Sequence, residues 1–408
     1  MFEQENIGPA PAAGPRVLIL PSWWYPNRNS PFSGIFIQRQ AAAIAAFCPT
    51  AVLFVTPDRS LKGRREIIAA VENGLLTVRA YFRPAPRSPW QMLSNTRRFM
   101  AAAAAGRRAL PLTFQNPDLL HVQVTPPVGL ILSLHFFWGR TPVVFSEHWS
   151  KYLLPAGREN PLRTWFIKRF TANCAAVTTV SDVLARAMRA KGFAAPFWRI
   201  IGNPVDPAVF FPRPKKTGKA GRTVTILHVS FLAEIKKTAG IVRAMALLAR
   251  RRPGVCLQVV GDGPTRTQCE ALARSLGLLG GVIRFSGALP EEAVATVMRC
   301  SDILVLFSEA ETFGCVAAEA LASGLAVVST PTAVAEFLPA AAGILVPFAD
   351  EEALAGALEK MVDRLPEFDN TPGRRAVMEH FAPREIGRRF RDLFLEVLEK
   401  QALIKAGN

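Results

Sequence analysis

The chain has 408 residues, of which 50% are hydrophobic, and its six cysteines form no CxxC pair. This length indicates two or three domains with a large core, and the cysteine spacing argues against a zinc site and a disulfide framework, which favours a reducing cytoplasm. The net charge of +17 lies mostly in residues 1–210, where 24 Lys and Arg stand against 10 Asp and Glu (+14). Such an excess favours an anionic partner, nucleic acid or a membrane surface, although charged runs more often only face solvent.

Residues 1–15 are acidic and rich in Pro and Ala, where a signal peptide would be basic and then apolar, so we expect a loose tail. The most hydrophobic long stretch, residues 128–145, contains His135, Arg140 and Pro142. These interruptions favour a buried helix and strand over a membrane span.

Short apolar, β-branched runs begin at residues 16, 50, 119, 142 and 175 and alternate with helical patterns. A Lys- and Gly-rich stretch, residues 213–223, follows, and a second alternation begins with runs at 224, 256, 282, 302, 325 and 343. This rhythm predicts two doubly wound α/β, Rossmann-like domains with parallel sheets, residues 16–212 and 213–380. We expect residues 381–408 to form a helix that packs back on the first domain.

Polar loops follow the predicted strands, and ligands of such sheets bind beyond the carboxyl ends of the strands. These loops are residues 21–34, 147–152, 230–237, 261–264 and 309–314. Two such domains with their polar loops facing each other would form a cleft.

The stretch SEAETFGCVAAEALASG, residues 308–324, places Glu311 and Glu319 eight residues apart. On a helix they would lie about 12 Å apart along the axis, which matches a nucleoside diphosphate sugar in scale. A diphosphate at the helix N-terminus, close to Gly314, would leave one carboxylate for sugar hydroxyls and the other for a ribose. Gly324 suits a left-handed helix end. The alternative is a capping Glu followed by an ordinary exposed one.

Glu311 to Glu319 resembles the E-x7-E motif of retaining nucleotide-sugar glycosyltransferases of family 4, which have the GT-B fold. The similarity continues through residues 260–264, 285–314 and 319–330, and upstream through 179–193 and 200–212. Residues 21–41 and 145–152 resemble a bacterial subgroup that builds surface polysaccharides. The resemblance covers most of the chain, and its second half is the more specific part.

The resemblance implies a role for several single residues. Glu311 would contact the transferred sugar, Glu319 the ribose hydroxyls, and Lys236 the diphosphate, whose departing charge a lysine stabilises. The remaining donor-binding residues would be Thr312, Phe313 and Gly314. The pattern is broken at Phe231, where the family usually has an arginine, and at Ser230, where it usually has a glycine. Lys237 or a basic residue of the first half would then have to compensate.

Two residues of the first half also match the family. Gly34 resembles the glycine that approaches the donor phosphate, and its alternative is a plain turn glycine. His148 would bond a hydroxyl of the transferred sugar or of the acceptor, although a lone histidine is more often structural. Both readings stay open at this stage.

The resemblance implies transfer with retention, in which a leaving phosphate oxygen takes the acceptor proton. The expected donor is a nucleoside diphosphate sugar, the acceptor a saccharide or lipid-linked saccharide, and the pathway lipopolysaccharide, capsule or exopolysaccharide assembly. No carboxylate pair with metal-binding spacing occurs in a suitable loop, so we expect no metal and no cofactor. A relative that hydrolyses or epimerises a nucleotide sugar is the near alternative.

Two rivals come from other classes. A basic nucleic-acid-binding protein would fit the sequence pI of about 10.3, but the chain has no RNP aromatic pair, KH motif or zinc finger, so we expect no nucleic-acid partner. A Rossmann oxidoreductase would need a third glycine where Arg266 stands.

Cations and aromatic residues also accompany each other in the first half, as in Arg97-Arg98, Arg107-Arg108 and residues 163–170. Such a pattern suits an anionic interface, since each cation near a bilayer contributes about 1 kcal/mol. We therefore expect a cytoplasmic protein that associates peripherally with the inner face of the membrane. The alternative is that the cations face solvent and that the tryptophans, including Trp138, belong to the core.

Overall fold

The computed structural model describes residues 14–155, 160–213 and 223–406. The chain forms two compact units, Met1–Pro204 together with Pro383–Asn408, and Val205–Ala382. The expected boundary after residue 212 therefore lies inside the second unit. The expected tail, apart from residues 14 and 15, and most of the expected link at 213–223 lie outside the described residues.

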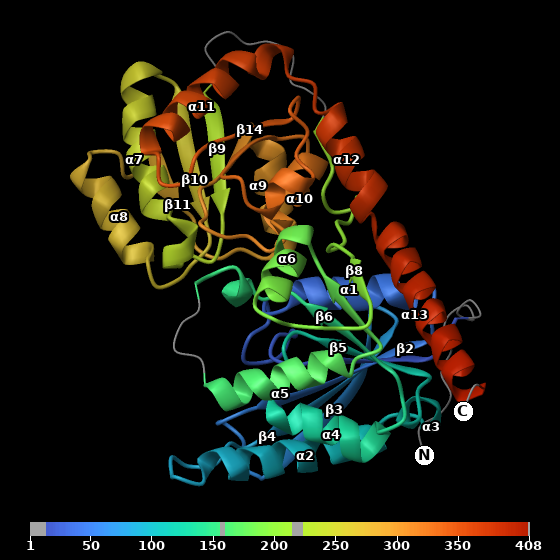
Figure 1. Cartoon of the computed structure of the whole chain (residues 1–408). Coiled ribbons are helices and arrows are strands. Elements are labelled where there is room, and N and C mark those ends of the chain that lie inside the picture. Colours follow the sequence, from blue (N-terminus) through green and yellow to red (C-terminus); the bar gives the residue numbers. More distant parts are fainter. Residues whose placement is uncertain (1–13, 156–159, 214–222, 407–408) are drawn as a thin grey trace. The chain divides into compact units, whose positions relative to one another are not determined.

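The first unit is built on an eight-stranded sheet with the order β3-β4-β2-β1-β5-β6-β7-β8 (Figure 1). Its strands are β1 (Val17–Pro21), β2 (Thr50–Pro57), β3 (Arg65–Glu72), β4 (Leu75–Phe82), β5 (Leu119–Gln123), β6 (Val143–Glu147), β7 (Ala176–Thr179) and β8 (Trp198–Ile200). The central strands β1 and β5 are buried along their whole length, because helices cover both faces of a parallel sheet.

The helices of the first unit are α1 (Ile35–Ala45), α2 (Gln91–Ala109), α3 (Leu112–Gln115), α4 (Val128–Trp138), α5 (Pro161–Ala172), α6 (Asp182–Ala190) and α13 (Pro383–Ala406). A short 3-10 turn spans Ser150–Tyr152. The apolar stretch 128–145 thus becomes helix α4 and strand β6. Throughout the described ranges, no helix has the length and the apolar character that crossing a membrane requires.

The β3–β4 hairpin is a feature that the sequence reading missed. β3 pairs with β4 antiparallel, whereas every other pairing in this sheet is parallel. Asn73 and Gly74 connect the two strands, and both have positive φ angles, 51° and 77°. An Asn-Gly pair with two left-handed residues is typical of a tight hairpin turn. That dipeptide was the available signal for the hairpin.

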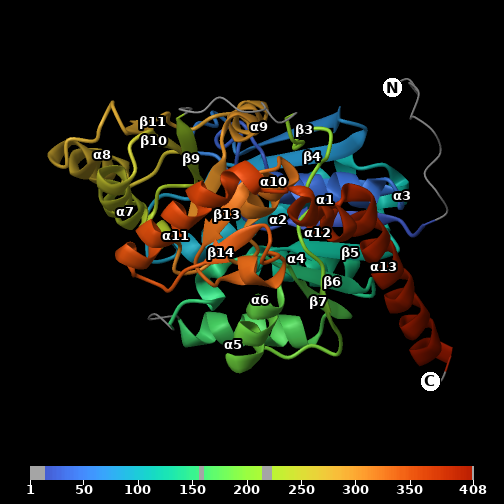
Figure 2. The same ribbon diagram turned by 90° about the horizontal axis from the view of Figure 1, so that it is seen from above.

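The C-terminal helix α13 belongs to the first unit and packs against α1 (Figures 1 and 2). Gly387 lies so close to α1 that a Cβ there would come within 2.1 Å of the Ala43 carbonyl oxygen. The buried rings of Phe390 and Phe394 contact His121 of β5, at centroid distances of 5.0 and 5.5 Å. The last helix therefore completes the core of a unit that begins almost 400 residues earlier.

The second unit has a six-stranded, all-parallel sheet with the order β11-β10-β9-β12-β13-β14. Its strands are β9 (Val224–Val229), β10 (Val255–Val260), β11 (Ile283–Phe285), β12 (Ile303–Leu306), β13 (Ala326–Ser329) and β14 (Gly343–Leu345). Counted from the first strand of the unit, this is the order 3-2-1-4-5-6 of a doubly wound nucleotide-binding fold.

The helices of the second unit are α7 (Thr238–Arg251), α8 (Arg266–Ser275), α9 (Glu291–Cys300), α10 (Cys315–Ala322), α11 (Glu351–Arg364) and α12 (Thr371–Phe381). Three short 3-10 turns span Glu234–Lys236, Ala333–Glu336 and Leu365–Glu367. Side chains of α7 and α11, among them Leu248 and Leu358, pack with Val305 and Val328 of the strands in one buried cluster. Each of the eleven expected runs forms a strand in one of the two sheets.

Candidate functional site

Strands β9 and β12 mark the point where the strand order of the second unit reverses. They are neighbours in the sheet, yet the chain continues from β9 to β10 on one side and from β12 to β13 on the other. The loops that follow these two strands therefore diverge and leave space for a ligand at their carboxyl ends. They are residues 230–237 and 307–314, which contain most of the predicted donor site.

Lys236 and Glu311 meet across these two loops. The Lys236 Nζ lies 2.7 Å from Glu311 Oε1, and the Ser308 hydroxyl donates to the same oxygen at 2.7 Å. The two charged side chains are 22% and 13% exposed, so the ion pair is shielded but reachable. The backbone N–H of Glu309 donates to the Ile235 carbonyl at 2.9 Å, which ties the two loops together. The structure thus joins two predicted site residues that are 75 positions apart.

His228 connects the start of the Lys236 loop to the neighbouring strand. It is fully buried in β9, its Nδ1–H donates to the Val305 carbonyl at 2.9 Å, and its Nε2 lies 2.8 Å from the Ser230 hydroxyl. Burial lowers the pKa of His228 to about 4, so the ring is neutral at pH 7 and its Nε2 accepts the Ser230 proton. His228 was not among the site residues predicted from the sequence, and the structure places it in contact with the donor loop.

The two carboxylates of the E-x7-E pattern do not share a helix, which corrects the sequence-based picture. Helix α10 begins at Cys315, so Glu311 lies in the preceding loop and the helical separation of about 12 Å does not apply. Glu319 lies within α10 and is only 7% exposed, unlike an ordinary surface glutamate. Gly324 has the expected left-handed conformation after the helix, with φ of 87°.

Gly314 forms the N-cap of α10 in a left-handed conformation, with φ of 85°. A Cβ at this position would come within 2.5 Å of the Val334 side chain. No side chain caps the helix and its first turn has no acidic residue, so nothing in that turn neutralises the positive end of the helix dipole. This end can therefore accept an anionic group.

Phe313 and Thr312 connect the carboxylate loop to the helix. The Phe313 ring is buried and packs against Phe337 and Phe381 at centroid distances of 5.4 and 4.8 Å. Its side chain therefore anchors the loop, and only its backbone is left for a ligand. Thr312, beside it, is half-buried.

The GDGP sequence, residues 261–264, holds the donor loop in place. A Cβ on Gly261 would lie 1.8 Å from the Ser230 carbonyl oxygen, so only glycine allows the two segments to approach. The Leu232 N–H donates to the Asp262 carbonyl at 3.0 Å, and the Thr265 hydroxyl donates to the Leu232 carbonyl at 2.8 Å. The sequence placed these residues among the polar loops at the strand ends but gave none of them a single role.

Lys237, the suggested replacement for the missing arginine, is already paired. Its Nζ lies 2.9 Å from Glu309 and 3.3 Å from Glu234, and the hydrogen bond to Glu309 is the main cause of its raised pKa. Phe231, which stands where the family has an arginine, is 66% exposed. Within the described loop, Lys236 is thus the cation that faces Glu311.

Gly34 and His148 lie near each other in the first unit. Gly34 precedes α1 with φ of 72°, and a Cβ there would come within 2.4 Å of the Trp24 backbone. The Phe36 ring, on the first turn of α1, packs against His148 at 4.8 Å. These contacts place the start of α1 beside the turn after β6.

His148 is a neutral, buried ring. Its Nε2 donates to Gln123 Oε1 at 2.7 Å, and its Nδ1 has no hydrogen-bond partner among the described residues. Burial lowers the pKa of His148 to about 3. Glu147 fixes the turn, since its Oε1 accepts from the backbone N–H of His148 and Trp149 at 2.8 and 2.9 Å. An unprotonated Nδ1 can accept a hydrogen bond from a hydroxyl group.

No group of three or more His, Cys, Asp and Glu side chains in the described part of the chain is arranged to hold a metal ion. The side chains gathered in the second unit have the chemistry to bind an anion. The site combines one lysine, one carboxylate and the positive end of a helix at the switch point of a nucleotide-binding sheet.

Two family models match the chain. Residues 37–209 match "Glycosyltransferase Family 4", and residues 223–364 match "Glycosyl transferases group 1". The D-inositol 3-phosphate glycosyltransferase of Corynebacterium urealyticum is 24% identical over 87% of this chain and 86% of its own length. The protein of the same name from Corynebacterium kroppenstedtii is 34% identical, but over 36% of this chain and only 35% of its own length.

Solved structures show the same fold. Sucrose-phosphate synthase from Thermosynechococcus elongatus superposes with a TM-score of 0.75 at 20% identity, covering 94% of this chain and 100% of the other. Alr3699/HepE of Anabaena, in complex with UDP and glucose, gives a TM-score of 0.72 at 17% identity, also over 94% and 100%. At this identity the likeness concerns the fold alone.

Proposed function

Because the chain belongs to glycosyltransferase family 4 and has the GT-B fold, we propose that it transfers a sugar from a nucleoside diphosphate sugar to an acceptor hydroxyl with retention at the anomeric carbon. The observation that carries this proposal is the Lys236–Glu311 pair in front of the α10 N-terminus. It combines a cation for a diphosphate, a carboxylate for sugar hydroxyls and a helix end for a phosphate.

Donor binding would exchange the partners of this ion pair. Without donor, Lys236 neutralises Glu311 at 2.7 Å. The diphosphate brings a stronger negative charge to Lys236, and Glu311 is then left to accept hydrogen bonds from the sugar hydroxyls. The Ser308 hydroxyl keeps the carboxylate in place during the exchange. The site thus pays no penalty for an unpaired buried charge in either state.

The chemical step would rest on positioning and electrostatics. Lys236 and the α10 N-terminus would stabilise the charge that develops on the leaving diphosphate, and the backbone at Gly314, the N-cap of α10, would lie close to the phosphate. The acceptor hydroxyl attacks on the face from which the phosphate departs, and a leaving phosphate oxygen takes its proton. No separate general base and no metal ion is then required. Glu319 would bind the ribose hydroxyls.

The first unit would supply the acceptor side. By the resemblance Gly34 would lie near a donor phosphate, and the neutral Nδ1 of His148 would accept a hydrogen bond from a sugar or acceptor hydroxyl. Residues 21–41 and 145–152, which contain both, support a role in lipopolysaccharide, capsule or exopolysaccharide assembly.

A lipid-linked acceptor would place the protein at the inner face of the cytoplasmic membrane. Large apolar side chains are exposed on the first unit beside cations, at the start of α2 and along α5: Trp90, Met92, Leu93, Leu162, Trp165 and Phe166. Trp138, by contrast, is buried and donates to the Gln115 carbonyl, so it belongs to the core. Co-sedimentation with anionic vesicles, reversed by salt, is the expected result. Equal sedimentation with neutral vesicles would contradict it.

A thermal-shift panel of UDP, GDP, ADP and their sugars tests the donor. UDP is the first choice because the Anabaena structure holds it. A nucleotide at 100 times its Kd raises the unfolding free energy by about 2.7 kcal/mol, which a melting curve resolves. No shift with any nucleotide at millimolar concentration would refute a nucleotide-sugar donor. Release of free sugar at the full rate without any acceptor would instead favour a hydrolase.

A further inference from the structure

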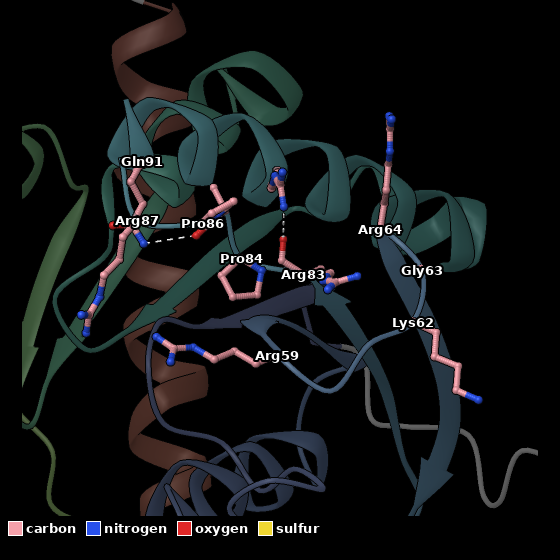
Figure 3. Close-up of a pocket in the computed structure, with 11 residues that line it drawn as sticks. Arg59, Lys62, Gly63, Arg64, Arg83, Pro84, Pro86, Arg87 and Gln91 are labelled. Atoms are coloured by element: carbon pink, nitrogen blue, oxygen red, sulfur yellow. Dashed lines mark hydrogen bonds between the residues drawn. The ribbon is translucent and has the colours of Figure 1, made fainter. Parts of the chain in front are cut away.

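A pocket of about 660 Å³ in the first unit has no part in the donor chemistry. It lies between the segment that follows β2 and the segment that leads from β4 into α2 (Figure 3). No acidic residue lines it, and its lining includes six cations: Arg59, Lys62, Arg64, Arg83, Arg87 and Arg98. In Figure 3, Arg59 from the first segment and Arg87 from the second extend on the same side of Pro84, whereas Lys62 and Arg64 lie on its other side.

These cations have no carboxylate partners in the described part of the chain. The nearby acids are already paired, since Arg28 contacts Asp58 at 2.6 Å and Glu66 at 2.9 Å. Arg98 uses one N–H to donate to the Arg83 carbonyl at 2.8 Å. Several like charges around one hollow repel each other, and a bound anion removes that repulsion.

Uncharged side chains and one carboxylate also hold the wall of the pocket in place. Asn95 of α2 accepts from the Ala85 N–H at 2.7 Å, and the Gln91 amide donates to the Ala85 carbonyl at 3.2 Å. On the opposite loop, the Asp58 carboxylate accepts from the Ser60 N–H at 2.8 Å. The backbone is therefore ordered before any ligand arrives, which lowers the cost of binding.

The chemistry of the lining selects the ligand. Arginine binds phosphate through two parallel hydrogen bonds and stays charged at any physiological pH. A single carboxylate would leave most of the six positive charges unbalanced, whereas a phosphate monoester or a diphosphate brings two or more negative charges and several acceptor oxygens. Exposed apolar side chains, Trp90 at 72% and Met92 at 78%, stand beside the lining residue Gln91.

We propose that this pocket binds the phosphate or diphosphate group of the acceptor. That the ligand is the acceptor rests on the proposed transfer reaction, but the binding of phosphate to the pocket does not. The group can belong to a soluble phosphorylated saccharide or to a lipid-linked one, and both present the same oxygens to the arginines.

The test measures binding of inorganic pyrophosphate to the full chain by calorimetry. All proteins carry Lys236→Ala, which weakens the separate site in the second unit. In this background Arg59→Gln/Arg87→Gln should raise the Kd for pyrophosphate about tenfold or more, because two charge-assisted contacts are lost. The matched control, Arg140→Gln/Arg284→Gln, removes the same net charge at two exposed arginines outside the pocket and should leave the Kd within about twofold.

A Kd that the pocket variant leaves unchanged, or that the control raises equally, would overturn the proposal. Arg59 and Arg87 are both exposed, and melting curves verify that the double variant folds. If it does not, the single variants Arg59→Gln and Arg87→Gln provide the same comparison. Vesicles that contain phosphatidic acid separate the two sources. A lipid-borne phosphate predicts that the pocket variant loses vesicle binding and the control does not, and a soluble one predicts equal binding by both.

The pocket proposal and the proposed function can be refuted separately, one by pyrophosphate binding and the other by nucleotide binding. If the pocket binds pyrophosphate while no nucleotide stabilises the protein, the proposed function is wrong and the pocket remains an anion site. If a nucleotide binds and the pocket variant keeps its affinity for pyrophosphate, the pocket proposal is wrong and the donor assignment stands.

Discussion

The cations of the donor loops in the second unit are paired with carboxylates, whereas, among the described residues, those of the basic pocket in the first unit are not. In the second unit, Lys236 and Lys237 each lie within 2.9 Å of a carboxylate, and a buried histidine supports their loop. In the first unit, the pocket cations line a hollow that no acidic residue enters. A paired cation can bind a ligand by exchanging partners, whereas an unpaired cluster has only its ligand to balance it. The paired lysines of the second unit suit a substrate that binds and dissociates in each catalytic cycle. The unpaired cations of the first unit suit a ligand with a fixed negative charge.

We expect the largest effect on activity when Glu311, the paired carboxylate of the second unit, loses its charge. Glu311→Gln should lower kcat by about 100- to 1000-fold, the usual cost of one preorganised electrostatic contact to the reacting group. Nucleotide affinity should stay within about threefold. Lys236 keeps its position, and the Glu311 carboxylate no longer competes with the diphosphate for it. Steady-state kinetics and calorimetry measure the two effects.

Two further variants check the assignment of Glu311. Glu309→Gln removes a half-exposed carboxylate that lies two residues before Glu311 and pairs with Lys237, and it should leave kcat nearly unchanged. Glu319→Ala should weaken nucleotide binding instead of turnover. The reverse pattern for the two glutamates of the motif would show that their roles are exchanged.

The donor loop can also be broken without touching a charge. Gly261→Ala places a methyl group where the Ser230 carbonyl oxygen lies, at 1.8 Å, in a backbone with φ of 131°. We expect a loss of about 2–4 kcal/mol in unfolding free energy, because the segments must separate and the backbone is strained. Gly356→Ala is the control, since a Cβ there meets nothing within 4 Å and alanine is favoured inside a helix. Equal stability of the two variants in urea would contradict this account.

Lys236→Ala removes the paired cation of the donor site and should weaken binding of a nucleoside diphosphate. The variant loses one charge-assisted contact to the diphosphate, so the Kd for a nucleoside diphosphate should rise by about ten- to a hundredfold. Lys360→Ala, at an exposed position on α11, is the matched control. A nucleoside without phosphates should bind both variants with the same affinity. If it also loses affinity, Lys236 acts on the loop and not on the diphosphate.

The buried histidine makes the donor loop sensitive to acid. The pKa of His228 is about 4 in the folded protein and near its ordinary 6.5 when unfolded, so the unfolded chain binds more protons between these values. Its contribution to stability is therefore complete above pH 6.5 and is lost as the pH falls below it. Between pH 6.5 and 5 the loss is about 2 kcal/mol. Urea unfolding should show a shallower pH dependence in His228→Asn, which keeps a donor toward Val305; an unchanged slope would contradict the assignment.

Chelation should have the smallest effect. EDTA is expected to leave transfer essentially unchanged, because the proposed stabilisation of the diphosphate comes from Lys236 and the α10 N-terminus. An assay with and without EDTA at fixed nucleotide concentration measures this. Complete loss of activity that Mg²⁺ or Mn²⁺ restores would refute it.

Much of the fold was readable from local patterns. The eleven apolar runs that predicted strands all form strands, because burial on both faces of a parallel sheet requires continuous apolar segments. The β3–β4 hairpin was missed, since its edge strand is half-exposed and its two strands follow each other directly, outside the alternation of strands and helices. The separation of Glu311 from the helix was missed as well, because a helix boundary depends on Gly314 and its left-handed backbone more than on periodicity.

The sequence alone determined the two alternating α/β patterns, the glycines that only a left-handed turn or a close approach explains, and the residue types of the donor loops. These features are local, since each depends on a few neighbouring side chains and on the backbone angles they permit. Tertiary structure decided which of these residues meet. Lys236 faces Glu311 across 75 positions, His228 lies beneath Ser230, and six separate cations surround one pocket. Such contacts follow from strand order and loop packing, which no short stretch of sequence specifies.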